Sequence, residues 1–494
     1  MALAVLLLYG LALLLLFLYN CGQLSLIISY LKAKKNRNKA TRIHIPVSEL
    51  PRVTVQLPVY NELYVVERLI DAIAQLNYPA DKLDIQVLDD STDETVSIIA
   101  SRIAHYQQLG VPIEHVRRPE RTGFKAGALS YGLTFAKGDL VAIFDADFVP
   151  DPDFLIKTVP HFTDPNVGIV QTRWEHLNEN FSLMTQLQAF GLNAHFTIEQ
   201  SGRYEAGYLA NFNGTGGVWR KTAIYDAGGW QSDTLTEDLD LSYRAQLRGW
   251  KFVYREDIGS PAELPVAMNA LKSQQYRWMK GAAECARKLF WKVLRTPGVS
   301  LSMKLHAFFH LFSSATFILV LILGIMSVPL IYIRNLHPEW EWVFYVINLF
   351  QFNLLILITF YGIPFWFFER ENKARIIWYF PMYSSLMMGL SLHNTIAVIE
   401  GYAGRKTPFI RTPKFNVTTA RDRWDANKYV SRKINWLTVI EGLLMLYFFG
   451  GLVLAFYVQD FRMFFLHIML MVGFGMVCVY SLIHASRRPI SVNA

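Results

Sequence analysis

Acidic residues stand at the ends of two short apolar runs in the first third of the chain. The run "IQVLDD" ends in Asp89 and Asp90, and "VAIFDAD" ends in Asp145 and Asp147. Carboxylates two residues apart at a strand end suit Mg²⁺ or Mn²⁺, because these hard cations prefer oxygen ligands and offset the charge of a diphosphate. The same pattern also occurs in solvated turns, so it indicates a metal site only together with other motifs.

A further acidic motif, "LTEDLDL", indicates the start of a helix. Thr236 is a suitable N-cap residue, and Glu237 and Asp238 fall in the first helical turn. Carboxylates are stabilised electrostatically at that position. The motif is therefore consistent with a plain acidic helix start as well as with a catalytic carboxylate.

Two segments could bring a ligand close to the backbone. Lys125, in "RTGFKAGAL", begins a predicted helix after a glycine, where an ammonium and a helix N-terminus could both face phosphate oxygens. The segment "FNGTGG", Phe212 to Gly217, has glycines that permit close approach. A surface lysine and a tight loop are the ordinary alternatives.

The segment "SQQYRWMKG", Ser273 to Gly281, places an amide, a guanidinium and an indole within five residues. Gln274, Arg277 and Trp278 lie at i, i+3 and i+4, so they share one face of a short amphipathic helix. Tryptophan and arginine at a membrane interface are the default explanation where no other motif accompanies them.

Short β-type runs alternate with helical stretches from residue 52 onward. The predicted strands are "VTVQL", "IQVLD", "IEHV" and "VAIFD"; helices are expected from about residue 62, from about residue 93 and over "FKAGALSYGLTFA". This alternation predicts a Rossmann-like α/β domain with a mainly parallel sheet, which binds ligands beyond the carboxyl ends of its strands. No glycine-rich dinucleotide fingerprint or Walker loop occurs, which disfavours an oxidoreductase or a P-loop nucleotidase.

The composition is that of an integral membrane protein with a globular insertion. Apolar residues make up 52% of the 494 residues, concentrated before residue 31 and after about residue 306. The net charge of +8 comes from basic residues beside the apolar runs, as in Leu31 to Arg42, which indicates topology and anionic lipid rather than nucleic acid. Cys21, Cys285 and Cys478 lack the spacing of a zinc site or a disulfide framework.

Charge placement predicts the topology. The first apolar segment, 1–31, has no basic residue before it, so we expect an uncleaved anchor with the N-terminus outside and residues 50–295 in the cytoplasm. A C-terminal membrane domain, 303–486, follows, with four spans expected at about 306–333, 341–369, 434–457 and 461–485.

The apolar run 376–400 differs from the others because it contains Ser, His, Asn and Glu. If it crossed the membrane, the basic segment Gly404 to Phe415 and the pair Arg487 and Arg488 would lie outside, against the positive-inside rule. We therefore expect an amphipathic helix in the cytoplasmic interface. The alternative is a sixth crossing whose polar residues line a pore.

The motifs together resemble those of the processive inverting β-glycosyltransferases of glycosyltransferase family 2, which include cellulose, chitin and hyaluronan synthases. The plant cellulose-synthase-like A and C enzymes are the most similar branch. Matching motifs run in family order between about residues 52 and 280: "LPVYNE", "VLDDSTDET", "GFKAGAL", "VAIFDADF", "FNGTGGVWR", "AGGW", "TEDLDL" and "QQYRW". The resemblance implies a GT-A domain inserted in a helical membrane domain. It also implies an enzyme that elongates β-glucan or β-mannan from a UDP- or GDP-sugar and translocates the product.

The resemblance implies a role for each matching residue. On the donor side, the nucleotide sugar would be bound by Asp89, Asp90, Lys125, Asp145, Gln274 and Arg277, and Mg²⁺ or Mn²⁺ by Asp145 and Asp147. Asp238 would be the general base, with Glu237 beside it in the catalytic motif. The acceptor sugar would be contacted by Trp278 together with Phe212, Asn213, Gly214 and Thr215.

A second resemblance concerns "KFNVTTARDRW", within a loop at 404–425 that is similar to the gating loop of bacterial cellulose synthase. Phe415, Val417 and Thr418 match its pattern. The expected partners are the donor, a growing glycan, the bilayer and accessory export proteins, in a bacterial inner membrane or, for a plant-like enzyme, the Golgi. The alternatives are a glycosyltransferase that adds one sugar to ceramide or diacylglycerol, and a transporter with a decayed domain.

Overall fold

The computed structural model describes residues 2–36, 45–350, 352–369, 372–419, 421–424, 427–430 and 433–486. Part of the basic cluster Leu31 to Arg42, and both Arg487 and Arg488, lie outside the described residues. All three cysteines are free thiols.

A seven-stranded sheet with the order β3-β2-β1-β4-β6-β5-β7 forms the centre of the globular part. β1 pairs in parallel with β2 and β4, β2 with β3, and β5 with β7, whereas β6 is antiparallel to β4 and β5. The strands are β1 (Val53–Val59), β2 (Leu83–Asp89), β3 (Ile113–Val116), β4 (Leu140–Ile143), β5 (Val167–His176), β6 (Gly217–Arg220) and β7 (Lys251–Ala262). The mainly parallel α/β sheet predicted from the alternating pattern is confirmed.

Helices cover both faces of this sheet, because its apolar strands must be buried on each side. On one face, α2 (Val66–Ala74) and α3 (Thr95–Gln108) pack against the strands through apolar residues such as Ile70 and Ile103. On the other, α4 (Phe124–Phe135) and α9 (Glu237–Gln246) do so through Leu129 and Leu241. Two short helices complete the domain: α5 (Phe154–Thr158) and α8 (Lys221–Asp226).

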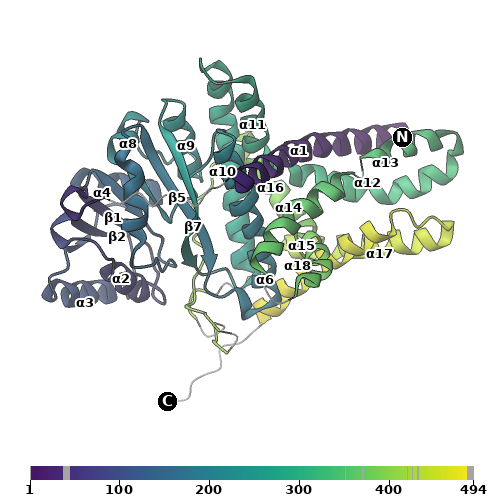
Figure 1. Ribbon diagram of the computed structural model, residues 1–494. Helices are drawn as coiled ribbons and strands as arrows, with labels where there is room; N and C mark the ends of the chain where they lie inside the picture. The colour runs from purple at the N-terminus through teal and green to yellow at the C-terminus, as the bar shows by residue number, and fades with distance from the viewer. Residues whose placement is uncertain are drawn as a thin grey trace.

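Five helical segments of the described chain are long and apolar enough to cross a membrane: Ala2–Lys35, Ser313–Leu336, Pro338–Phe368, Trp436–Val458 and Phe464–Ser486. They correspond to α1 (Ala2–Asn36), α12 (Thr316–Leu336), α13 (Glu341–Leu349) with α14 (Phe352–Phe368), α17 (Trp436–Val458) and α18 (Phe464–Ser486). Figure 1 shows them extending to one side of the sheet, with the N-terminus far from it. The start of the apolar run at 306 belongs to a separate helix, α11 (Leu301–Leu311).

Residues 376–400 form two helices, α15 (Ile376–Gly389) and α16 (Ser391–Ala403), rather than one. α15 crosses α18 at Gly389, where a Cβ would lie 2.1 Å from the carbonyl oxygen of Gly473. Small residues at a crossing let two helix backbones approach closely. Whether this pair of helices lies in the membrane interface stays a prediction.

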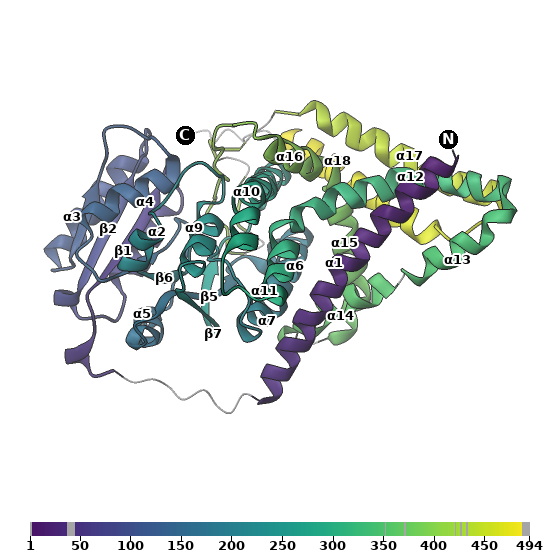
Figure 2. The same ribbon diagram turned by 90° about the horizontal axis from the view of Figure 1, so that it is seen from above.

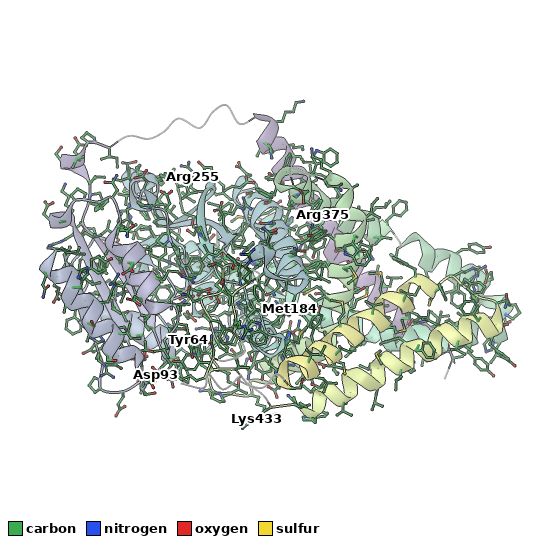
Figure 3. All side chains as sticks on the ribbon, turned by 90° about the horizontal axis from the view of Figure 1, so that it is seen from below. Tyr64, Asp93, Met184, Arg255, Arg375 and Lys433 are labelled. Atoms are coloured by element: carbon green, nitrogen blue, oxygen red, sulfur yellow. The ribbon has the colours of Figure 1, made fainter. Side chains whose placement is uncertain are left out.

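Three elements join the sheet to the apolar helices: α6 (Leu183–Ala194), α7 (Ser201–Glu205) and α10 (Met268–Arg295), as Figure 2 shows. Met184 marks the position of α6 in Figure 3. α10 contains the "QQYRW" motif but has 28 residues, so the short helix expected there was wrong in length. It continues because residues such as Cys285 and Leu289 bury a further apolar face against Ala307 and Leu311 of α11.

Candidate active site

A pocket lies beyond the carboxyl ends of β1 and β4, under α10 and the segment that follows α16. Most of the residues predicted from the sequence motifs line it: Asp90, Lys125, Asp145, Asp147, Asn213, Gly214, Glu237, Asp238, Gln274, Arg277 and Trp278. These residues come from six separate parts of the chain. The predicted residues that do not line it are Asp89, Phe212, Thr215, Phe415, Val417 and Thr418.

Asp238 lies in the first turn of α9, where the amide nitrogen of Leu239 donates to its Oδ1 at 2.8 Å. Burial, reinforced by the neighbouring Glu237, raises the pKa of the Asp238 carboxyl to about 7. A carboxylate with its pKa near neutral pH is suited to accept a proton from a substrate hydroxyl. Thr236 occupies the N-cap position as expected, but its side chain makes no capping hydrogen bond.

A glycine of α10 brings that helix next to the start of α9. A Cβ on Gly281 would lie 2.7 Å from the hydroxyl oxygen and 2.9 Å from the amide nitrogen of Thr236. Only a residue without a side chain permits this approach. The close crossing therefore sets the "QQYRW" face of α10 and the acidic turn of α9 on the same pocket.

Lys125 is the second residue of α4, two positions after the N-cap Gly123, and reaches across the pocket floor. Its Nζ lies 2.5 Å from Oδ1 of Asp145 and donates to the carbonyl oxygen of Gly214 at 3.1 Å. Burial works to lower the pKa of Lys125, but the charges of Asp145 and Glu237 outweigh it and the pKa is raised. Lys125 is therefore a permanent positive charge beside the two acidic motifs.

Three positive side chains approach the pocket from the opposite side. Lys414 Nζ lies 2.6 Å from Oδ2 of Asp147, and Arg411 lies 2.6 Å from the Glu62 carboxylate. Arg277 donates to the hydroxyl of Thr412 at 2.7 Å. Lys414, Arg411 and Thr412 all follow α16, so the segment between α16 and α17 completes the pocket wall.

The donor set at Asp145 and Asp147 fits a hard cation in kind, because both offer carboxylate oxygens. Each carboxylate is paired with a lysine, and the described residues hold no group of three or more His, Cys, Asp or Glu side chains that could bind a metal ion. A cation at these two residues would need further oxygen ligands from a diphosphate or from water.

Three predicted residues support the site from behind. Asp89 is buried and pairs with His115 at 2.9 Å. Phe212 is fully buried against Trp219. The Thr215 hydroxyl accepts from the amide nitrogen of Asp145 at 2.9 Å. Asp89 is thus fixed at the end of β2, Phe212 packs on one face of the sheet, and Thr215 holds the backbone of Asp145.

The residues expected in the gating loop also lie outside the pocket wall. The ring of Phe415 stacks on that of Trp424 with 5.8 Å between the ring centroids. Val417 is fully buried beside Ala270, and the amide nitrogen of Thr418 donates to the carboxylate of Asp422. Farther along, Lys428 donates from its amide nitrogen to the Tyr64 hydroxyl at 3.1 Å. Tyr429 contacts Asp93 as well as Tyr64, and Figure 3 shows those two residues together at one edge of the globular domain.

Sequence reasoning missed several pocket residues: Glu62, Trp174, His176, Phe409, Arg411, Thr412 and Lys414. Arg411 belongs to a basic segment that the sequence analysis used for topology, and Lys414 begins the segment compared with a gating loop, but neither residue was predicted in the pocket. Burial lowers the pKa of His176 to about 3, so this pocket residue is neutral. The acidic residue Glu62 closes the quoted motif "LPVYNE", which was the available signal for it.

A family model described as "Glycosyltransferase like family 2" matches residues 51–281. Glucomannan 4-beta-mannosyltransferase 1 of Oryza sativa subsp. japonica is 36% identical over 386 residues, which cover 74% of this chain and 70% of the relative. Glucomannan 4-beta-mannosyltransferase 9 of Arabidopsis thaliana is 34% identical over 428 residues, covering 82% and 76%, respectively.

Among solved structures, a mannosyltransferase from Pyrobaculum calidifontis, in complex with GDP-Man and Mn²⁺, has a similar fold. Its TM-score is 0.53 at 19% identity, and the match covers 81% of this chain and all of the other.

Proposed function

The chain belongs to glycosyltransferase family 2, in the cellulose synthase superfamily, and we propose that it elongates a β-linked glycan from a nucleotide-diphosphate sugar at the pocket described above. The observation that carries this proposal is the convergence of Asp238, Lys125 and Arg277 on one pocket with Trp278. The curated relatives are named as glucomannan 4-beta-mannosyltransferases, and the Pyrobaculum calidifontis mannosyltransferase was solved with GDP-Man, so β-1,4-linked mannosyl transfer from GDP-mannose is the first candidate reaction.

Asp238 would act as the general base in a single displacement. Its carboxylate takes the proton of the acceptor hydroxyl, the acceptor oxygen bonds to the anomeric carbon, and the bond from that carbon to the phosphate oxygen breaks. The configuration at the anomeric carbon is inverted. The leaving diphosphate carries its negative charge toward Lys125, Arg277 and Lys414, whose positive groups stabilise it.

Trp278 would bind the acceptor sugar through its ring face. It lines the pocket one helical turn from Gln274, on the face of α10 that Arg277 shares. An indole contacts the face of a sugar without strong directional bonds, so a glycan can move along it after each addition.

We propose Mg²⁺ or Mn²⁺ as the cofactor, held by Asp145 and Asp147 together with the diphosphate. When bound, the cation would neutralise charge on the leaving group. The support is the pair of pocket-facing carboxylates. Because two carboxylates leave most ligand positions of such a cation open, the diphosphate of the nucleotide would supply further oxygen ligands.

We also propose that the product crosses the membrane through the protein, because lipid cannot satisfy the hydroxyls of a glycan. Aromatic side chains gather where α6 meets α14 and α15. The ring of Phe190 stacks on that of Tyr361 with 5.5 Å between the ring centroids, and the ring centroids of Tyr361 and Tyr383 are 4.9 Å apart. The neighbouring Leu192 of α6 lines the pocket. A passage beginning here would have the pocket on the cytoplasmic side.

The test is to incubate the purified enzyme in lipid nanodiscs with radiolabelled GDP-mannose or UDP-glucose, with and without Mn²⁺. We expect a polymer from GDP-mannose that β-mannanase degrades. Label found only in the lipid fraction would favour a glycosyltransferase that glycosylates ceramide or diacylglycerol. No transfer from any nucleotide sugar would reject the proposed function.

A further inference from the structure

A π-helical turn interrupts the helical run beside the pocket. Residues His195–Gln200 form it, between α6 and α7. In such a turn the backbone bonds run from i to i+5, so His195 and Gln200 come to lie above one another; turns of this type are rare and often occur at functional sites. Both side chains point at the same neighbour, Asn213.

The amide of Asn213 is held at both ends. Its Nδ2 donates to Nε2 of His195 at 3.0 Å, and its Oδ1 accepts from Nε2 of Gln200. Gln200 also donates to the carbonyl oxygen of Asn211 at 2.8 Å, which ties down the backbone on the other side of Phe212. We call His195, Glu199 and Gln200 the Asn213 clamp.

The half-buried carboxylate of Glu199 fixes the orientation of His195. Its Nδ1 lies 2.9 Å from Oε2 of Glu199, whose other oxygen accepts from Arg203 at 3.0 Å. Burial works to raise the pKa of Glu199, but the hydrogen bond with His195 and the charge of Arg203 outweigh it and the pKa is lowered. An ionised Glu199 accepts the proton of Nδ1, which leaves Nε2 of His195 as the acceptor that Asn213 needs.

The residue after Asn213 faces the proposed base. Gly214 has φ of +81°, and a Cβ on it would lie 3.0 Å from Oδ2 of Asp238 and 3.4 Å from Nζ of Lys125. The clamp therefore holds one side of a loop whose other side borders Asp238. A shift of this loop would change what lies next to the base.

The position of the clamp indicates the acceptor rather than the donor. The π-turn contacts α1 and α14 of the membrane region. Asp90, which would bind the nucleotide, follows β2 near one edge of the sheet and pairs with Arg118, whereas the π-turn contacts β7 at the other edge. A neutral, hydroxyl-rich glycan that leaves toward the membrane helices would pass the clamp, whereas the diphosphate would not.

We propose that His195, Glu199 and Gln200 are positioning residues that hold Asn213 so that the acceptor sugar lies with its hydroxyl at Asp238. The inference rests on the proposed function, because it concerns how the acceptor of that reaction is placed. It predicts a loss of transfer to sugar without a loss of donor binding or of attack by water.

The measurement is the partition of one nucleotide-sugar donor between transfer and hydrolysis. In hydrolysis, water replaces the acceptor hydroxyl as the attacking group and the same bond to phosphate breaks, so this reaction reports the donor side alone. We expect His195→Ala to lower transfer between about ten- and a hundredfold, as for a misplaced reactant, with hydrolysis and donor Kd within about twofold of wild type. His105→Ala, at an exposed position of α3, is the control and should change neither.

Two polar substitutions separate positioning from folding. A glutamine amide oxygen can stand where Nε2 of histidine stands, whereas an asparagine side chain reaches only the position of Nδ1. His195→Gln should therefore retain most of the transfer, and His195→Asn should lose it. The proposal would be overturned if the ratio of transfer to hydrolysis were the same in His195→Gln and His195→Asn. It would also be overturned if transfer and hydrolysis fell by the same factor in both variants.

A double-mutant cycle tests the route through Asn213. If His195 acts only through that residue, His195→Ala combined with Asn213→Ala should lower transfer no more than Asn213→Ala alone. Multiplicative effects of the two substitutions would overturn the inference. If the wild-type enzyme does not transfer sugar, the proposed function is rejected. If wild type and His195→Ala transfer sugar equally well, only the role of the Asn213 clamp is rejected.

Discussion

The ammonium nitrogen of Lys414 lies 2.6 Å from a carboxylate oxygen of Asp147, and the two side chains are only 11% and 10% exposed. Lys414 follows the second helix of the segment 376–403, more than 250 residues from its partner in the sequence. An ammonium and a divalent cation compete for the same carboxylate oxygens. The ion pair therefore couples the position of the segment after α16 to whether a divalent cation is bound at Asp147.

We expect Lys414→Met to lower the Mn²⁺ concentration needed for half-maximal donor binding by several-fold. The substitution keeps the length of the side chain but removes the competing charge. The measurement is calorimetric titration of the nucleotide sugar at a series of Mn²⁺ concentrations. Lys406→Met, at an exposed position of the same segment, is the matched control. A Mn²⁺ requirement that is unchanged or higher in Lys414→Met would show that the two cations do not compete.

Asp238→Asn should abolish transfer while donor binding stays nearly unchanged. Only the proton-accepting group is lost, and general-base catalysis typically contributes about 10²- to 10⁴-fold. Single-turnover transfer and donor Kd are measured side by side, with Asp233→Asn, a half-exposed acid of the preceding loop, as control. Residual turnover above about a tenth of normal, a barrier change of only about 1.4 kcal/mol, would exclude Asp238 as the base.

The pH profile should follow the raised pKa of Asp238. The base works only when ionised, so kcat/KM should fall about tenfold per pH unit below roughly pH 7 and level off above it. The effect on stability has the opposite sign: because the folded-state pKa of Asp238 lies above the ordinary aspartate value of 3.8, the folded state loses stability as pH rises from about 4 to 7. Asp238→Asn should therefore have a higher Tm than wild type at pH 8, and an equal or lower Tm would contradict this electrostatic account.

Chelation of divalent cations should stop transfer completely. The diphosphate needs a cation where Asp145 and Asp147 face the pocket, and excess EDTA removes it. Asp147→Ala should give the same loss in saturating Mn²⁺, whereas Asp151→Ala, at a half-exposed site, should not. The readout is radiolabel incorporated into glycan; full incorporation in excess EDTA would rule out the metal requirement.

The sequence predicted the parts of the fold that depend on local pattern. β3 was expected at Ile113–Val116 and is found there, and α4 was expected over 124–136 and ends one residue earlier. β5, β6 and β7 were not predicted. Their residues lie among aromatic and polar stretches such as "QTRWEH", and they form strands because they pair with β4 and with one another.

The residues of the candidate site were likewise predicted where they belong to local sequence motifs and missed where they do not. Asp145 and Asp238 stand at element ends that local pattern identifies, so their place in the pocket followed from motif order. Arg411 and Lys414 reach it from a segment without regular structure, and their contacts with Glu62 and Asp147 depend on tertiary packing that no spacing in the sequence encodes. The resemblance to a gating loop indicated this segment, but the residues before Phe415 line the pocket instead.

The last prediction concerns topology and the direction of export. Residues 404–415 should face the cytoplasm, because Arg411 and Lys414 line the pocket that would bind a cytoplasmic nucleotide sugar. Residues near Asn335, at the far end of α12, should face outside. In a chain stripped of Cys21, Cys285 and Cys478, we place single cysteines at Lys406 and Asn335, both of which are exposed. Labelling intact cells with an impermeant maleimide should modify position 335 but not 406.

The export route is then tested in sealed inverted membrane vesicles supplied with the donor on the outside. If the glycan leaves through the aromatic cluster of Phe190, Tyr361 and Tyr383, it accumulates inside and resists added glycanase until detergent is present. Phe190→Ala should shorten or slow the product without changing donor Kd, because Phe190 contacts the membrane helices and does not line the pocket. Labelling of position 406 in intact cells would contradict the predicted topology. Glycan found outside the vesicles would contradict export through the protein.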